Sequence, residues 1–101
     1  MTTLIVQYRI EDGARPELET AVGELMAAVA EAAPPGVRYV LGTLPDGMSV
    51  VGLLELADGA ENPLPSLPAA RAFQQDLARW IVGDPPVPVP VDLLGAYAAD
   101  R

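Results

Sequence analysis

Apolar residues alternate with other residues over the first ten positions of the chain, and their spacing then lengthens. Period-two alternation predicts a strand over residues 3–10. Beyond Asp12 and Gly13 the apolar residues recur every three or four positions, which predicts an amphipathic helix that begins near Pro16 and ends before Pro34. The apolar strand positions are Leu4, Val6, Tyr8 and Ile10, and the helical ones are Leu18, Ala21, Val22, Leu25, Met26 and Val29.

The second half of the chain repeats this change of period. Residues 37–43 and 48–56 are rich in β-forming residues, and the Leu-Pro-Asp-Gly run at 44–47 predicts a hairpin turn between them. Residues 57–66 contain Gly and Pro and predict a loop, with Ser66 as the N-cap of a second helix over Leu67 to Ile81 that the run from Gly83 terminates. Residues 87–97 then predict a last strand. Because Pro88 and Pro90 lack backbone N–H donors on one side, the start of that strand is expected at a sheet edge.

The order strand, helix, strand, strand, helix, strand predicts one fold class. Right-handed crossovers arrange such a chain as a four-stranded antiparallel sheet with both helices on one face. The expected architecture is a ferredoxin-like α+β sandwich. We expect residues 1–101 to form a single domain, since this length with 50% apolar residues can bury a core.

Side chains alternate between the two faces of a strand, and this alternation places a set of apolar residues on the sheet face that no helix covers. Five large aliphatic residues fall on this outer face, and burying them contributes on the order of 8–15 kcal/mol per subunit before association costs. We therefore expect a homodimer that joins sheet to sheet. Opposite charges on the same face, Arg9 and Arg38 against Glu55 and Asp92, either pair across the interface or remain solvated. The expected interface residues are Ile5, Arg9, Arg38, Val40, Val51, Leu53 and Leu94.

Composition excludes several kinds of chemistry. The chain contains no histidine, cysteine or lysine, which removes the common nucleophiles, Schiff-base formers and neutral-pH proton shuttles. A net charge of −8 with scattered arginines argues against nucleic acid as a partner. No signal-like N-terminus and no apolar run of about 18 residues occurs, so we expect no membrane association and a cytoplasmic protein.

Motifs for metals and phosphates are weak. Asp58 and Glu61 form at best an isolated acidic pair, and no glycine-rich phosphate loop occurs, so no metal and no nucleotide cofactor are expected. Glu17, Glu24 and Glu31 are spaced seven apart and predict the solvated face of the first helix.

The element order, the hairpin at Pro45, Asp46 and Gly47, and the closing run from Asp92 to Tyr97 resemble a known group. The chain is similar to the dimeric α+β barrel superfamily, in particular to the antibiotic biosynthesis monooxygenase-like proteins. The resemblance implies a homodimer with a ligand pocket between each sheet and its helices. Haem-cleaving members use a histidine ligand that this chain lacks. Other members oxygenate phenols without metal, flavin or haem, so no cofactor is expected. No catalytic residue is transferred by motif.

The residues expected in or near the pocket are Tyr8, Tyr39, Asn62, Trp80 and Tyr97. Each also has a structural interpretation: the aromatic residues as core or strand anchors, and Asn62 as a cap of its own loop. Two functions follow. One is cofactor-independent monooxygenation of an aromatic or polyketide-like molecule; the other is a non-catalytic barrel that binds a small apolar ligand or serves as an assembly module. A pocket of roughly several hundred Å³ with converging tyrosine hydroxyls favours the enzyme.

Overall fold

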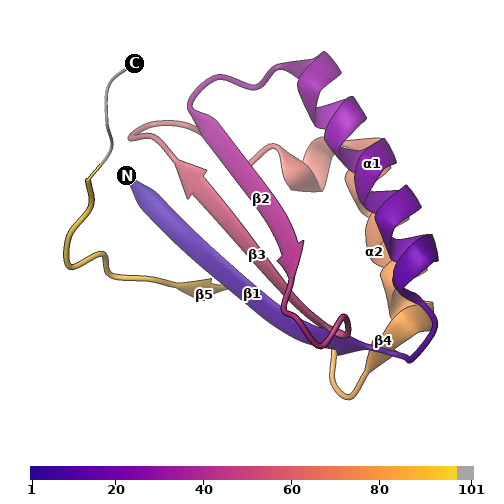
Figure 1. The fold of residues 1–101 in the computed structure, drawn as a ribbon. Helices are drawn as coiled ribbons and strands as arrows, with labels where there is room; N and C mark the ends of the chain where they lie inside the picture. Colours follow the sequence, from indigo (N-terminus) through magenta and orange to yellow (C-terminus); the bar gives the residue numbers. More distant parts are fainter. Residues whose placement is uncertain (98–101) are drawn as a thin grey trace.

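Two helices cover one face of an antiparallel sheet (Figure 1). The computed structural model describes residues 1–97 of the 101. Strand β1 lies inside the sheet, in the order β2-β3-β1-β4, and β5 also pairs with β1. The ferredoxin-like α+β fold predicted from the sequence is confirmed. The elements are β1 Thr2–Ile10, α1 Arg15–Ala32, β2 Val37–Thr43, β3 Ser49–Leu56, the 3-10 helix η1 Leu64–Ser66, α2 Pro68–Trp80, β4 Ile81–Val82 and β5 Val89–Pro90.

The core lies between the sheet and the helices, where the predicted apolar stripes meet. Helix α1 contributes Leu18 and Leu25, and α2 contributes Phe73 and Leu77; all four are buried. Helix α1 ends as its sequence predicts: Ala33 adopts the left-handed conformation, with φ 46°, and its N–H donates to the carbonyl of Val29 at 2.9 Å. The two helices are therefore held by side-chain packing more than by capping, since neither has a side-chain N-cap.

The predicted second helix is confirmed, but it is one residue shorter at each end than the expected Leu67 to Ile81, and its predicted N-cap was wrong. Ser66 is not its N-cap but the last residue of η1, and α2 begins at Pro68, whose fixed φ suits a first helical turn. The helix ends at Trp80, because Ile81 is already extended (φ −74°, ψ 142°) and pairs with Ile10 in the sheet.

The strand predicted over residues 87–97 is reduced to β5, and a second short strand, β4, forms from residues expected at the end of the second helix. Val82 pairs with Arg9, and Val89 pairs with Ile5, so residues 83–88 lie opposite only residues 6–8 of β1. Six residues therefore span the length of three and bow away from the sheet. The prolines at 85, 86 and 88 explain this bulge, because they cannot donate to a β ladder. The expectation that this strand lies at a sheet edge is confirmed for β5, which pairs with β1 alone.

The prediction of a strand continuing to residue 97 was wrong, since no strand is described after Pro90. Asp92 and Leu94 consequently do not lie on the outer sheet face, and Tyr97 does not face the helices; all three are exposed. The segment still starts in contact with the sheet, because the Val91 N–H donates to the Thr3 carbonyl at 2.9 Å.

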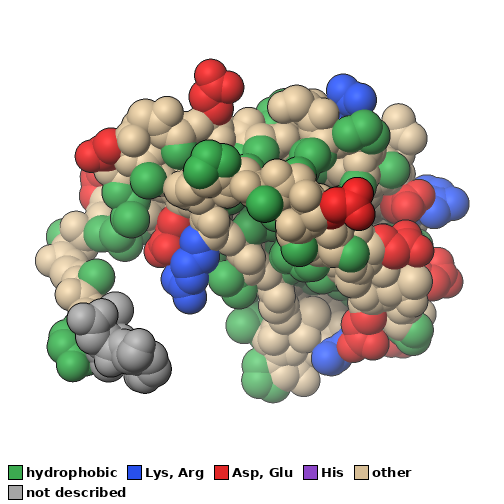
Figure 2. Space-filling view, turned by 90° about the horizontal axis from the view of Figure 1, so that it is seen from above, with side chains coloured by type: hydrophobic (Ala, Val, Ile, Leu, Met, Phe, Trp, Pro, Cys, Tyr) green, Lys and Arg blue, Asp and Glu red, His purple; other side chains and the backbone are tan. Residues whose placement is uncertain are grey.

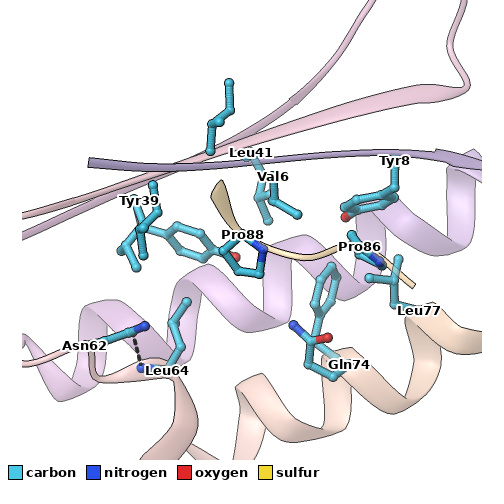
Figure 3. Close-up of a pocket in the computed structure, with 15 residues that line it drawn as sticks. Val6, Tyr8, Tyr39, Leu41, Asn62, Leu64, Gln74, Leu77, Pro86 and Pro88 are labelled. Atoms are coloured by element: carbon cyan, nitrogen blue, oxygen red, sulfur yellow. Dashed lines mark hydrogen bonds between the residues drawn. The ribbon is translucent and has the colours of Figure 1, made fainter. Parts of the chain in front are cut away.

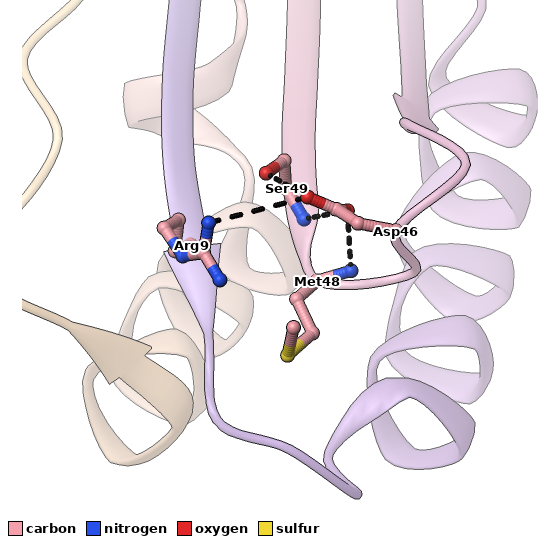
Figure 4. Close-up of polar contacts among 4 residues, drawn as sticks. All are labelled: Arg9, Asp46, Met48 and Ser49. Atoms are coloured by element: carbon pink, nitrogen blue, oxygen red, sulfur yellow. Dashed lines mark hydrogen bonds and ion pairs between the residues drawn. The ribbon is translucent and has the colours of Figure 1, made fainter.

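The outer face of the sheet carries an apolar centre between two polar ends. Cross-strand registry aligns Val40, Leu53 and Ile5 in one row. At one end of the face, Arg38 Nη1 lies 3.3 Å from Glu55 Oε1 within the same chain. At the other end, Arg9 Nη1 lies 4.0 Å from an Asp46 oxygen (Figure 4).

The hairpin turn between β2 and β3 is closed by one carboxylate (Figure 4). Asp46 Oδ1 accepts the backbone N–H groups of Met48 and Ser49 at 2.9 and 2.8 Å, and Oδ2 accepts the Ser49 hydroxyl at 2.7 Å. These hydrogen bonds lower the pKa of Asp46 to about 2, since they stabilise the ionised form. The Pro-Asp-Gly pattern therefore predicted a turn whose geometry the Asp side chain maintains.

Candidate functional site

A cavity of about 150 Å³ lies between the sheet and α2 (Figure 3). Its walls are mainly apolar, and four polar side chains join them: Tyr8, Tyr39, Asn62 and Gln74. Among the predicted pocket residues, Tyr8, Tyr39 and Asn62 are brought together here. The apolar walls include Leu4, Val6, Leu41, Leu54, Phe73 and Leu77.

Tyr8 on β1 and Tyr39 on β2 approach the cavity from either side of β3, with their hydroxyls pointing toward one another (Figure 3). The Tyr8 hydroxyl is buried and has no hydrogen-bond partner within residues 1–97. Burial, together with the nearby Tyr39, raises the pKa of Tyr8 to about 12, and burial also raises the pKa of Tyr39. Both phenols are therefore neutral at physiological pH: each carries an O–H group that a ligand oxygen can accept from, and neither is a base.

Asn62 and Gln74 form a polar rim. Asn62 Oδ1 accepts the backbone N–H of Leu64 at 3.1 Å, which is the loop-capping role that the sequence offered as its structural interpretation. Its amide NH₂ is a donor that this bond leaves unused. Both rim residues are exposed, so the cavity opens to solvent at this side.

Pro86 and Pro88 belong to the bulge of residues 83–88 and also line the cavity. Sequence reasoning missed them as site residues, because it placed Pro88 in a regular strand. The excess of prolines over what a strand tolerates was the available signal. The bulge therefore widens the sheet edge at the point where the cavity lies.

Gly52 forms part of the cavity wall on β3. A Cβ at this position would lie 2.8 Å from Val6 Cγ1 and 2.9 Å from Leu41 Cδ2, closer than side-chain atoms normally approach. The missing side chain thus makes room for two neighbouring aliphatic groups. This position carried no functional expectation from the sequence.

The remaining two predicted pocket residues lie elsewhere. Trp80 is buried between the helices, its Nε1–H donates to Glu17 Oε2 at 3.1 Å, and the Arg79 guanidinium lies 5.8 Å from its ring centroid. Tyr97 is exposed and lines no part of this cavity. Glu17, predicted only as a solvated residue, therefore also has a structural role in holding the indole.

No protein-family model and no curated protein sequence matches the chain. Solved structures match it in fold. A "putative antibiotic biosynthesis monooxygenase" from Chloroflexus aurantiacus is 17% identical with a TM-score of 0.66, and the match covers 96% of each chain. A dimeric ferredoxin-like protein of unknown function from Jannaschia sp. is 16% identical with a TM-score of 0.69, covering 91% of this chain and 98% of that one. The chain has the fold of these proteins. The resemblance predicted from the sequence is confirmed at that level.

The same fold carries other named activities. An L-rhamnose mutarotase from Formosa agariphila matches with 12% identity and a TM-score of 0.59, over 95% of this chain and 98% of that one. A shared fold therefore does not decide the reaction, and function has to be argued from the cavity itself.

No helix among the described residues has the length and apolarity to span a membrane. Within residues 1–97, no three acidic, histidine or cysteine side chains gather in a way that could hold a metal ion. Asp58, one member of the weak acidic pair noted in the sequence, pairs with the N-terminal amino group of Met1.

Proposed function

We propose that this protein is a small cofactor-independent monooxygenase-like protein that acts on an aromatic molecule carrying a phenol oxygen. The observation that supports this most is the buried Tyr8 hydroxyl, which has no partner among the described residues and borders an apolar cavity. An engineered cavity of about 150 Å³ in another protein binds benzene. The present volume of about 150 Å³ is smaller than the pocket that the sequence led us to expect; it suits one aromatic ring, with larger substrates extending past the rim.

The proposed role of the tyrosines is to stabilise negative charge on the substrate oxygen. A neutral phenol that has already lost its water shell donates strongly to a phenolate at small reorganisation cost. The substrate phenol releases its proton to water at the open rim, and the electron-rich phenolate ring then reduces dioxygen itself. A phenol with a free para position plus O₂ gives a para-quinone plus water: one oxygen atom becomes the new carbonyl, and the other leaves with the two hydrogens. All four electrons come from the ring, so no external reductant is needed.

Oxygen consumption and quinone formation with dihydroxynaphthalenes and anthrones test the oxygenase. We expect turnover by the wild type and a loss in kcat/KM of about 100-fold in Tyr8→Phe, in line with removal of one oxyanion donor. Tyr97→Phe is the matched control, since Tyr97 is exposed and lies outside the cavity. Equal activity of Tyr8→Phe and Tyr97→Phe would remove Tyr8 from the mechanism. Inertness of the wild type across the panel would remove the oxygenase.

A second candidate is a non-catalytic module that binds a small apolar ligand. It is favoured by the chemistry of the cavity lining, whose polar side chains are all neutral and include no general base. Calorimetric titration with naphthol separates the two candidates, because binding without oxygen uptake supports the module. No measurable heat at millimolar naphthol would count against both.

We also propose that two copies associate through their outer sheet faces. The apolar row of Val40, Leu53 and Ile5 supports this, as do the charged residues that border it at both ends. Sedimentation of the wild type is expected to give a dimer at micromolar concentration, and Leu53→Asp is expected to give a monomer. Ala30→Asp, at an exposed position of α1, is the control and should remain dimeric. A monomeric wild type would overturn the proposal.

A further inference from the structure

We infer that the bulge of residues 83–88 determines the size of the ligand: it is a movable wall of the cavity that shifts outward when a ligand with two fused rings binds. This inference rests on the proposed binding of an aromatic molecule, but not on its oxygenation. The cavity of about 150 Å³ has the volume that holds a single benzene ring. A second fused ring extends beyond this volume, so part of the lining has to give way.

The bulge forms one wall of the cavity. Pro86 and Pro88 line it, and Figure 3 shows both on the segment that passes between the sheet and α2. Pro86 is the one residue of the bulge that is not exposed, whereas its neighbour Val87 is 73% exposed. Most other lining residues belong to β1, β2, β3 and α2, which backbone hydrogen bonds hold in place. The bulge is therefore the wall that can move at the lowest cost.

The bulge is attached to the domain only at its ends. The short strands β4 and β5 pair with β1 on either side of it. Within residues 1–97, no backbone hydrogen bond joins residues 83–88 to another segment, and three of these six residues are prolines without an N–H to donate. The next anchor is the bond from the Val91 N–H to the Thr3 carbonyl, and beyond it the chain extends away from the body of the molecule (Figure 2).

The bulge also has the spare length to move without breaking either strand pairing. Its anchors on β1, Ile5 and Arg9, are four residues apart, which is about 13 Å along a strand. The seven steps from Val82 to Val89 can span about 23–25 Å, so about 10 Å of slack remains. Gly83 adopts φ 89°, and a Cβ there would have nothing within 4 Å, so the backbone can rotate at this end of the bulge.

A disulfide tests whether the bulge has to move, because the natural chain contains no cysteine. Pro86→Cys and Gln74→Cys are combined, since these residues line the cavity from the bulge and from α2. Phenol and naphthol are titrated by calorimetry into the oxidised and the reduced protein. We expect oxidation to weaken naphthol binding by at least about tenfold, or about 1.4 kcal/mol, and phenol binding by less than about twofold. The single variant Pro86→Cys, under the same oxidant and reductant, is the control and should show neither change.

A nitroxide spin label measures the movement directly and needs no disulfide. Val87→Cys carries the label at an exposed position of the bulge, and Ala30→Cys carries it on the exposed side of α1 as the control. We expect saturation with naphthol, but not with phenol, to change the mobility of the label at position 87 in the electron paramagnetic resonance spectrum. Neither ligand should change the spectrum of the control.

Three outcomes would overturn the inference. If oxidation weakens phenol and naphthol binding equally, or if naphthol leaves the label at position 87 unchanged, the second ring passes the rim without disturbing the bulge. If the reduced protein binds phenol but not naphthol, the bulge is a fixed wall. Failure of the proposed oxygenase gives a different result, because the bulge would still respond to naphthol although no oxygen is consumed.

Discussion

The two sides of β1 differ sharply. On one side, β3 pairs with it at eight consecutive positions and β2 continues the ladder at seven. On the other side, β4 and β5 contribute two pairs each, separated by the proline bulge. The regular side is built from β-forming residues with one buried face, whereas the irregular side has four prolines between 85 and 90. The comparison teaches that one strand can support a continuous ladder and an open edge at once.

The candidate site lies where the irregular side begins. Tyr8 belongs to the part of β1 opposite the bulge, and Pro86 and Pro88 from the bulge share its cavity. A continuous fourth strand would pair with residues 6–8 and leave less room there. The cavity therefore lies where strand pairing becomes irregular. Functional sites commonly occur at such departures from regular structure.

The largest expected difference in unfolding free energy is between two valine substitutions, one in β3 on the regular side of β1 and one in β5 on the irregular side. Val50→Ala in β3 should lower the free energy of unfolding by about 2–3 kcal/mol, because Val50 is 2% exposed and truncation leaves a cavity. Val89→Ala in β5 should change it by less than about 0.5 kcal/mol, because Val89 is 54% exposed. Urea unfolding measures both. Similar losses in the two variants would contradict the proposed contrast.

A second test compares two glycines. Gly52→Ala in β3 should lower the free energy of unfolding by about 1–3 kcal/mol, since the new Cβ overlaps Val6 and Leu41. Gly23→Ala in the middle of α1 should raise it by about 0.5–1 kcal/mol, because nothing lies within 4 Å and alanine favours the helix. If both substitutions raise the free energy of unfolding, the side chains of Val6 and Leu41 move aside for the new Cβ more easily than the short distances indicate.

The pH dependence of stability tests the burial of Tyr8. Its pKa rises from 10.0 in the unfolded chain to about 12 in the fold, so the unfolded chain loses the proton first as pH increases. Stability is then present below about pH 10 and falls toward about pH 12. Because Tyr8 is only half-buried, we expect its share to be about 1 kcal/mol. In urea unfolding at increasing alkaline pH, Tyr8→Phe should therefore lose less unfolding free energy than the wild type. An identical loss in both proteins would exclude a buried Tyr8 phenol.

The smallest expected effect is at the hairpin turn of the regular side. The lowered pKa of Asp46 stabilises the fold above about pH 3.8, and this contribution disappears as pH falls through about 2. Asp46→Asn should therefore lower Tm slightly at neutral pH and not at all at the acid end. Asp84→Asn, in the bulge, is the control. A neutral-pH effect of Asp84→Asn as large as that of Asp46→Asn would contradict the special role of this turn.

The sequence predicted the regular side of the sheet well, because the two-residue repeat of apolar positions there matches the face that the core buries. The period-two runs at 3–10, 37–43 and 48–56 coincide closely with strands, since one face of each is buried against helices. The last strand could not be predicted in the same way. Val, Leu and Tyr at 87–97 have β propensity, but the prolines remove ladder donors, and residues 92–97 are exposed instead of being covered by the helices.

The candidate site was predictable only in part. The alternation of side chains along the strands placed Tyr8 and Tyr39 on the helix-facing side of the sheet, where they line the cavity. Gly52, Pro86 and Pro88 could not be found this way, because their contribution depends on missing atoms and missing hydrogen bonds. Trp80 shows the opposite problem: helical spacing located it correctly on the buried stripe, but spacing does not say that it faces Glu17 between the helices.

The position of Trp80 has a practical consequence. It is the only tryptophan in the chain, it is buried, and it lies outside the cavity that contains Tyr8 and Tyr39. Its intrinsic fluorescence therefore reports on the contact between α1 and α2. A shift in its emission wavelength during unfolding monitors the loss of packing between the two helices. If the emission stays constant while naphthol binds, the ligand leaves this packing undisturbed.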